Sequence, residues 1–324
     1  MGEGVADLLA LWDMGSAEFK LVAARENRVF RVTDGLHTYA LRLHRPGLRS
    51  NEELRSELVW MAELGREGIS VPHPVAAQNG EFLREQRGQQ ASMLTWMSGT
   101  PLGSTGQPLD QPDRRGIFFK LGQQMARMHA VSDRWTPPAW FKRIRWDRDT
   151  LVGPDPLWGR FWENPDLDAD ERTLLQRFRR EADARLEELD HVLDTGLIHA
   201  DLVRENVMID GQDLHLIDFD DAGFGYRMFD VSTALFKNRQ EPDYRELETA
   251  FLTGYGSARN LDVSTLDLFL GLRAVSYVGW IIARHDEEGG RSRSKRMIED
   301  ATDLVEAYLS ASRHASFPQL EVSP

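Results

Sequence analysis

Short apolar runs separated by turn residues fill the first hundred positions, a pattern that is typical of antiparallel strands. Aromatic and branched residues dominate the segments 18–25, 27–33 and 37–45, and an Asp-Gly pair at 34–35 separates the last two as a hairpin turn. Two further strands are expected within 72–103, around a turn that contains glycine. The pattern therefore predicts a small twisted sheet.

The segment 50–68 has the spacing of an amphipathic helix instead. One face of it is formed by four apolar residues, Leu54, Leu58, Met61 and Leu64. Ser50 or Asn51 is available as the N-cap, and Gly65 or Gly68 marks the end of the helix. We expect this helix to pack on the sheet.

After a connection rich in Gly and Pro, the apolar spacing becomes helical and stays so over most of the chain. Helices are expected at 114–132, 169–193, 243–255, 263–285 and 296–311. A boundary near residue 98 would divide the chain into an N-terminal unit, 1–97, and a mostly helical unit, 98–324. This order of elements predicts an α+β fold.

Composition narrows the setting of these 324 residues. The absence of Cys excludes disulfides and thiolate metal sites. A formal net charge of -13 argues against general binding to nucleic-acid phosphates, so no nucleic-acid partner is expected. No apolar run approaches the roughly 18 residues that cross a bilayer, and the first residues lack the features of a signal peptide. We therefore expect a cytoplasmic protein without a membrane partner, and the oligomeric state stays open.

Acidic residues gather around two short apolar strands between residues 197 and 223. The strands flank the turn "DGQD", so Asp210 and Asp213 belong to a solvated hairpin tip. Asp201 and Asn206 precede the first strand, whereas Asp218 and Asp220 follow the second. Because a hairpin brings its two ends together, Asn206 and Asp218 should converge, with Asp201 a few Å away. Carboxylate and amide oxygens suit Mg²⁺ better than zinc.

An oxygen-lined site beside a further carboxylate is what phosphoryl transfer from ATP requires. The pattern His199, Asp201 and Asn206, followed by "DFD" at 218–220, resembles the catalytic loop and metal-binding segment of the protein-kinase-like fold. More narrowly, "HADLVRENVMID" and "IDFDDAGFGYRMFD" are similar to the aminoglycoside phosphotransferase superfamily. That superfamily includes type II homoserine kinases, choline kinases and the stress-response Ser/Thr kinase group. The resemblance covers roughly residues 17–285 and implies a bilobal kinase-like fold.

The resemblance assigns roles to the residues of the acidic segment. It implies that Asp201 is the catalytic base, that Asn206 and Asp218 are metal ligands, and that Asp220 is a further ligand or orients one. Arg204 would reach the transferred phosphate, although a solvated loop Arg is the alternative. His199 is expected to be structural. Asp230 is expected to cap the next helix or to hold the catalytic loop through backbone N–H groups.

The same resemblance makes the N-terminal unit the nucleotide lobe. Arg42 stands where the family usually has a Lys that contacts phosphates, and Glu57 stands at the position of its ion-pair partner; an exposed strand Arg is the alternative. The segment between the first two strands lacks glycine, so Glu26, Asn27 and Arg28 are expected to contact phosphates there. The segment 93–97 matches the one that receives adenine in the family, and there Thr95 and Met97 are the expected contacts, unless it is an ordinary apolar strand.

Three classes of function follow from these residues. The first is an ATP- and Mg²⁺-dependent kinase of a small hydroxylated molecule, most plausibly a homoserine-like amino acid or amino alcohol, or an aminoglycoside. The second is a Ser/Thr protein kinase of the stress-response type, which Val203 disfavours because such kinases usually have a Lys there. The third is an inactive nucleotide-binding scaffold.

Acceptor binding is expected in two places. The helix at 263–285 presents Tyr277 and Trp280, with Arg284 and Asp286 nearby, although core packing is the favoured explanation for the two aromatic residues. The insertion 133–165 holds five of the nine Trp residues. Its later Trp residues, Trp158 and Trp162, should pack on helices. In its earlier part Trp140 and Trp146 alternate with Lys142, Arg143, Arg145 and Arg148, which predicts a rim that contacts an anionic group.

Overall fold

The protein forms two compact units, each assembled from stretches that lie far apart in the sequence. The structure is a computed structural model that describes residues 2–24 and 27–315. One unit comprises Met1–Ile144, Asp201–Ala222 and Glu241–Asn260; the other comprises Arg145–Ala200, Gly223–Gln240 and Leu261–Pro324. We call them the first and the second unit. The expected boundary near residue 98 stays a prediction.

A five-stranded antiparallel sheet dominates the start of the first unit. Its spatial order is β1-β2-β3-β5-β4, with β1 (Glu18–Ala24), β2 (Arg28–Thr33), β3 (Thr38–Leu43), β4 (Leu83–Gln86) and β5 (Gln89–Thr95). The turn between β2 and β3 lies at the expected Asp-Gly pair, where Gly35 has a φ of 93°. Glycine adopts this conformation without the steric cost that a Cβ brings. The predicted strands are therefore confirmed.

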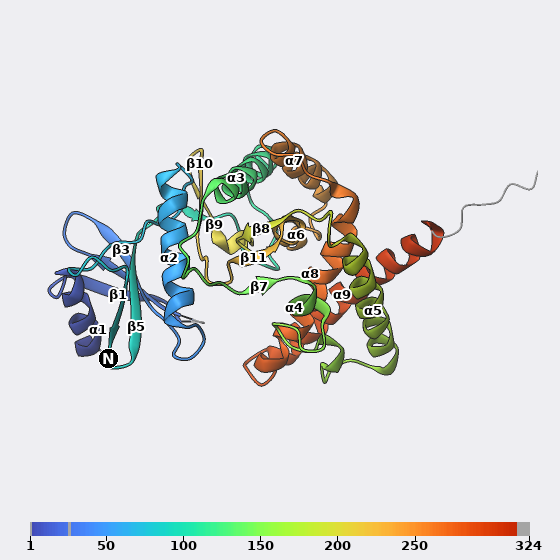
Figure 1. Ribbon diagram of the computed structural model, residues 1–324, viewed down its shortest axis with the longest axis horizontal. Coiled ribbons are helices and arrows are strands. Elements are labelled where there is room, and N and C mark those ends of the chain that lie inside the picture. Colours follow the sequence, from blue (N-terminus) through green and yellow to red (C-terminus); the bar gives the residue numbers. More distant parts are fainter. Residues whose placement is uncertain (1, 25–26, 316–324) are drawn as a thin grey trace, which may run out of the picture. The chain divides into compact units, whose positions relative to one another are not determined.

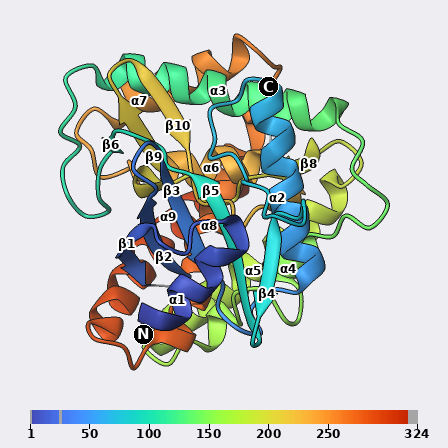
Figure 2. The same ribbon diagram turned by 90° about the vertical axis from the view of Figure 1, so that its left-hand side faces the viewer.

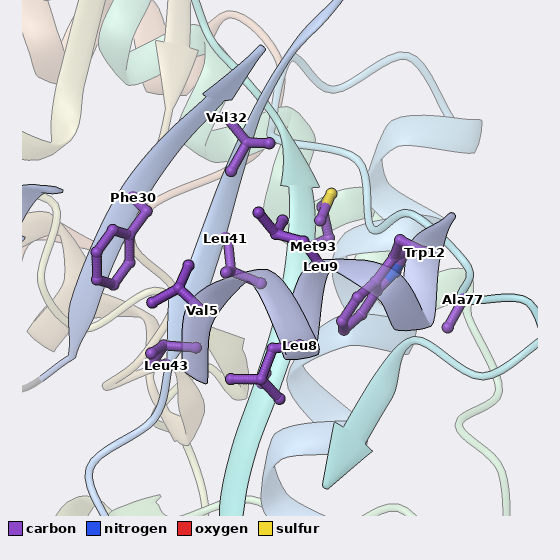
Figure 3. Close-up of a cluster of buried hydrophobic side chains, with 11 residues drawn as sticks. Val5, Leu8, Leu9, Trp12, Phe30, Val32, Leu41, Leu43, Ala77 and Met93 are labelled. Carbon is purple, nitrogen blue, oxygen red and sulfur yellow. The ribbon is translucent and has the colours of Figure 1, made fainter. Parts of the chain in front are cut away.

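One face of this sheet is covered by a helix that the sequence patterns did not predict. Helix α1 (Gly2–Leu9) and the turn that follows it lie over the strands (Figures 2 and 3). The apolar side chains of this segment pack on buried residues of β2, β3 and β5: Val5, Leu8, Leu9 and Trp12 against Phe30, Val32, Leu41, Leu43 and Met93. The Trp12 indole also donates a hydrogen bond to the Val75 carbonyl, at 2.9 Å.

Helix α2 (Asn51–Arg66) begins as its sequence predicts. Ser50 is the N-cap, because its hydroxyl accepts from the Glu53 amide while the Glu53 carboxylate accepts from the Ser50 amide. The expected apolar face is buried, and Trp60 joins it by donating its indole N–H to the Ser132 hydroxyl at 3.0 Å. Ser132 belongs to helix α3 (Arg114–Arg134), so this hydrogen bond links the two helices.

The rest of the first unit is a small sheet and a pair of closely packed helices. The sheet has the order β10-β9-β6, with β6 (Thr100–Pro101), β9 (Val207–Asp210) and β10 (Asp213–Leu216). Helix α3 packs on α7 (Tyr244–Gly256) through Gly122 and Gly254, where a Cβ would collide with the carbonyls of Phe251 and Phe119. The expected hairpin that carries the acidic residues is formed by β9 and β10.

The second unit is mostly helical, and Figure 1 labels its elements. Its helices are α4 (Arg148–Val152), α5 (Ala169–Leu189), α6 (Arg227–Phe236), α8 (Leu266–Trp280) and α9 (Gly290–Ala315). A small sheet of order β7-β11-β8 is formed by β7 (Arg145–Trp146), β8 (Thr195–Ile198) and β11 (Gly223–Tyr226). The N-terminal segments form a sheet and the later segments are mostly helical, so the predicted α+β fold is confirmed.

One apolar segment of the second unit is long enough to cross a membrane. In the part of the chain that the structure describes, Val263–Arg284 is the helical segment that is long and apolar enough to cross a membrane. However, 78% of its most apolar window is buried inside the protein. Such burial is that of a core helix, and α8 accordingly packs on α6 and α9.

The packing of α1 generates a stability prediction. Leu9 is fully buried between α1 and the sheet, so Leu9→Ala should lower the free energy of unfolding by about 2–5 kcal/mol, the range for a cavity left by a deleted Leu side chain. Leu36, which is 90% exposed, provides the control Leu36→Ala, with little expected change. Urea unfolding of both variants measures the difference. Equal stabilities would show that α1 does not contribute to the core.

Candidate active site

Asp201 and Asn206 are held together by the loop that precedes β9. The Asn206 side-chain amide donates to the Asp201 carbonyl at 2.8 Å and to its carboxylate at 3.0 Å. The Asn206 carbonyl accepts from the Ile217 amide at 3.0 Å, and Ile217 directly precedes Asp218. These contacts bring the two ends of the hairpin together, as the sequence predicts.

Asp230 fixes the backbone just before Asp201. Its carboxylate accepts from the amides of His199 at 3.0 Å and Ala200 at 2.8 Å. Ala200 has a φ of 63°, a left-handed conformation that is unfavourable for Ala, and these hydrogen bonds compensate for it. Of the two roles expected for Asp230, holding the loop is the one that these contacts support. His199 is fully buried.

Asp218 lies two residues beyond the end of β10 in a second left-handed conformation, with a φ of 66°. Desolvation by the surrounding protein raises the pKa of its carboxyl; Arg42 opposes this rise, and nearby Asp220 adds to it. The residue keeps an exposed face, and contact with water limits the desolvation. A group whose pKa is raised in this way gains from a cation bound beside it.

Arg42 connects three elements of the first unit. From β3 its guanidinium contacts the Glu57 carboxylate on α2 at 2.5 Å and the Asp220 carboxylate at 3.2 Å. Arg42 is 5% exposed, so the interpretation as an exposed strand residue is wrong. The planar guanidinium can contact two carboxylates at once, whereas an ammonium is a single point charge. Its contact with a nucleotide phosphate stays a prediction.

Two positive charges keep Glu57 ionised inside the protein. Burial by itself would raise the pKa of Glu57, but the guanidinium groups of Arg42 and Arg143 outweigh it and lower the pKa to about 2. Burial and the same Arg42 charge lower the pKa of His44 to about 3. His44 is therefore neutral at physiological pH, and its ring contacts the Ser92 hydroxyl at 2.9 Å.

The expected metal ligands have a donor set that fits a hard cation. Both hydrogen bonds of the Asn206 side-chain NH₂ group go to Asp201. The side-chain oxygen Oδ1 of Asn206 thereby stays available as an acceptor. Asp218 adds a carboxylate, while Asp220 already binds Arg42 through one oxygen. Within residues 2–24 and 27–315, no three His, Cys, Asp or Glu side chains form a metal-binding cluster. Mg²⁺ needs no such cluster, since one or two carboxylates, water and substrate phosphates suffice.

The remaining residues that are expected to contact the nucleotide lie on the five-stranded sheet or directly beside its strands. The Asn27 side chain accepts from the Arg45 amide at 3.4 Å, and Arg28 is exposed and donates to Gln89 at 3.3 Å. Thr95 ends β5, with its hydroxyl accepting from the His73 amide at 2.8 Å, and Met97 is half-buried just beyond. Glu26 lies outside the described residues. Their nucleotide contacts stay predictions.

Arg204 is turned toward a buried carboxylate instead of solvent. Its guanidinium contacts Glu241 at 2.6 Å and the Gln107 carbonyl at 2.7 Å, and the residue is 3% exposed. The alternative of a solvated loop Arg is therefore wrong. A contact with the transferred phosphate stays a prediction.

The early part of the Trp-rich insertion is not a uniform exposed rim. Arg143 is buried in the first unit, and Trp146 is buried in the second unit, where it stacks on Phe229 at 5.1 Å. Trp140 and Arg145 remain exposed. The alternation of aromatic and basic residues had suggested one surface, but the chain passes from one unit to the other between residues 144 and 145. The rim prediction is thus wrong for Arg143 and Trp146.

Trp158 and Trp162 pack within the second unit, as expected. Trp162 lies under the Arg179 guanidinium of α5, at 4.3 Å, and Trp158 lies 5.9 Å from Tyr277 on α8. Tyr277 itself is buried and accepts from Arg273 at 2.7 Å. These contacts favour core packing over acceptor binding for Tyr277.

A kinase-like α+β fold in which a hairpin brings a carboxylate, an amide and a DFD segment together is typical of phosphate-transferring proteins. A sequence model of the phosphotransferase enzyme family matches residues 18–263, and the chain belongs to that family. The resemblance to aminoglycoside phosphotransferases is thereby confirmed.

Individual relatives match most of the chain. Amicoumacin kinase from Bacillus subtilis (strain 168) is 26% identical over 95% of this chain and 94% of its own length. A homoserine kinase from Agrobacterium fabrum (strain C58) is 29% identical over 81% of this chain and 78% of its own length. A solved structure of the microcompartment-associated aminopropanol kinase is 29% identical, with a TM-score of 0.82, and covers 95% of this chain and 97% of that one.

The charge state of Glu57 generates a pH prediction. Because the folded pKa of about 2 lies below the ordinary value of 4.5, ionised Glu57 stabilises the fold fully above pH 4.5 and loses this effect as the pH falls toward 2. The stability difference between wild type and Glu57→Gln should therefore shrink over that interval. Urea unfolding across the pH range measures it, with Glu52→Gln, an exposed residue of α2, as the control. A constant difference would contradict the assigned charge.

Proposed function

We propose that this protein transfers the γ-phosphate of ATP to a hydroxyl group of a small amine-bearing molecule. The observation that carries the proposal is the Asn206 side chain, which binds Asp201 through its amide and is tied through its backbone to the residue before Asp218. The proposed proton acceptor and the proposed cation-binding carboxylate thus lie at the two chain ends of one hairpin, which these hydrogen bonds link, an arrangement that suits phosphoryl transfer.

The residues of the first unit divide the work between proton transfer and nucleotide binding. Asp201 accepts the proton of the attacking hydroxyl and orients it, a role that needs an ionised carboxylate fixed by neighbours. Asn206 and Asp218 hold the divalent cation, for which we propose Mg²⁺, and Asp220 orients the site through Arg42. When bound, the cation neutralises charge on the triphosphate. Arg42 approaches the phosphates while Glu57 keeps it in place.

The named relatives support a small acceptor that carries both an amine and a hydroxyl. Homoserine and aminopropanol have these groups in common, and their kinases match this chain at 29% identity. A solved amicoumacin kinase of similar fold was obtained with AMP-PNP and Ca²⁺, which supports the use of a nucleotide and a divalent cation. We propose a homoserine-like amino acid or amino alcohol as the acceptor, with an aminoglycoside-type antibiotic as the alternative, and a cytoplasmic location.

Two alternatives are less well supported. A Ser/Thr protein kinase is not favoured, because the relatives named above act on small molecules and Val203 stands in place of the usual Lys. An inactive scaffold is disfavoured because Asp201, Asn206 and Asp218 are all present at the linked ends of one hairpin.

A panel assay tests the proposal. Wild-type protein with Mg·ATP should consume ATP in the presence of a hydroxylated amine such as homoserine or aminopropanol, and should produce the phosphate monoester, which mass spectrometry identifies. Aminoglycosides and a mixture of Ser- and Thr-containing peptides form the other arms of the panel. Phosphorylation of peptides alone would establish the protein kinase, and nucleotide binding without transfer to any acceptor would establish the scaffold.

Asp201 provides the most direct mutational prediction. Asp201→Asn removes the proton acceptor but keeps the size of the side chain, so turnover should fall by ~10²-fold or more. Binding of Mg·ATP, measured by calorimetry, should change little, because Asp201 is not one of the proposed cation ligands. Asp210→Asn, at the exposed hairpin tip, is the control. Near-normal turnover of Asp201→Asn would remove Asp201 from the role of base.

A further inference from the structure

Arg143 is the most completely enclosed guanidinium group near the candidate active site. Its side chain has no exposed surface. All of its described hydrogen bonds go to main-chain carbonyls: Ala222 at 2.6 Å, Asp220 at 2.8 Å, Phe219 at 2.9 Å and Glu53 at 2.9 Å. Three of these carbonyls follow Asp218 directly, and the fourth lies in the first turn of α2. One side chain therefore joins the DFD segment to that helix.

The same guanidinium also faces the partner of Arg42. Its Nη1 lies 3.5 Å from the second carboxylate oxygen of Glu57, whose first oxygen binds Arg42. That second oxygen is buried and has no hydrogen-bond partner in the described structure. Arg143 thus supplies the positive charge that faces it. The backbone beside Arg143 is anchored to α2 as well, because the Lys142 amide donates to the Ser56 hydroxyl at 2.8 Å.

The segment 218–222 is held from other sides by two further arginines. Arg42 binds the Asp220 carboxylate at 3.2 Å, and Arg49 binds the Asp221 carboxylate at 3.0 Å. These two contacts reach side chains, whereas Arg143 alone among the three holds the main chain of the segment. The main chain determines where the Asp218 and Asp220 side chains point, so the positions of Asp218, a proposed cation ligand, and of Asp220 depend on Arg143.

We propose that Arg143 is a positioning residue for phosphoryl transfer, which fixes the DFD segment against α2 and so aligns Asp218, Asp220 and the Arg42–Glu57 pair for the nucleotide. It touches no reacting group itself. The proposal rests on the proposed function and extends it to a residue of the insertion. A guanidinium fork spans several carbonyls at once, whereas a Lys ammonium donates from a single atom.

Two substitutions test this role. Arg143→Met keeps an unbranched apolar side chain but leaves the buried carbonyls without their hydrogen-bond donor. Arg143→Lys keeps the positive charge but lacks the forked guanidinium group that reaches several carbonyls. The catalytic efficiency kcat/KM for Mg·ATP should fall by ~10–100-fold in Arg143→Met, the range for removal of a group that orients cation ligands. Arg143→Lys should lie between it and wild type. The KM for the acceptor, homoserine or aminopropanol, should stay unchanged.

The matched control is Arg66→Met, at the last residue of α2. The Arg66 side chain is 67% exposed and contacts Glu63 at 2.7 Å. Arg66→Met should retain wild-type constants for both substrates. A raised acceptor KM in Arg143→Met with unchanged Mg·ATP kinetics would overturn the proposal in favour of an acceptor rim. Unchanged kinetic constants for both substrates would overturn it in favour of packing alone.

Hydrogen–deuterium exchange provides a readout that needs no turnover. Arg143→Met should accelerate amide exchange in the peptides covering 51–60 and 217–222, while the peptide covering α7 stays as protected as in wild type. Equal acceleration in all peptides indicates general destabilisation and would overturn the proposal, as would unchanged exchange at 217–222. If Arg143→Met does not fold, amide exchange in the same peptides is compared between Arg143→Lys and wild type. Absence of phosphate transfer by the wild type would refute the proposed function, but these exchange rates would still decide whether Arg143 positions the segment.

Discussion

A buried carboxylate that must stay ionised organises the first unit. Glu57 is 1% exposed, and an isolated charge in such a place would be strongly unfavourable. Arg42 and Arg143 face its two oxygens, and each of these arginines also reaches the DFD segment. One compensated charge therefore connects strand β3, helix α2, the insertion and the proposed cation ligands. Removing either guanidinium would leave one buried oxygen of Glu57 without a facing positive charge, which is unfavourable inside a protein.

Hydrogen bonds from polar and charged groups also hold unfavourable backbone conformations in the loops of the candidate site. Asp218 has a left-handed backbone conformation that non-glycine residues adopt only when their surroundings hold them. Arg143 donates hydrogen bonds to the main chain that follows Asp218. The Asn206 main-chain carbonyl accepts from the amide of Ile217, the residue before Asp218. Asp230 performs a corresponding task at Ala200. Carboxylates and guanidinium groups thus stabilise non-glycine residues in backbone conformations that glycine adopts without strain.

The insertion shows how a surface-like sequence can contain a buried structural residue. "WFKRIRWDRD" alternates aromatic and basic residues, which favours an exposed rim, yet Arg143 is enclosed while Arg145 is exposed. The local pattern contains no signal for this difference. Carbonyls contributed by residues 53 and 219–222 determine it, and they are brought to Arg143 only by folding.

Much of the architecture could be read from the sequence because it depends on local chemistry. The strands rich in aromatic and branched residues, the cap of α2 at Ser50 and the hairpin that carries the acidic residues follow from neighbours only a few positions apart. The grouping of Asp201, Asn206 and Asp218 followed from that hairpin for the same reason. Helix α1, the short strands β7, β8 and β11, the buried pairing of Arg204 with Glu241 and the enclosure of Arg143 were decided by tertiary structure. Each of these depends on partners that are distant in sequence, and the free energy of burying a polar or apolar group is set by those partners and not by the residues beside it.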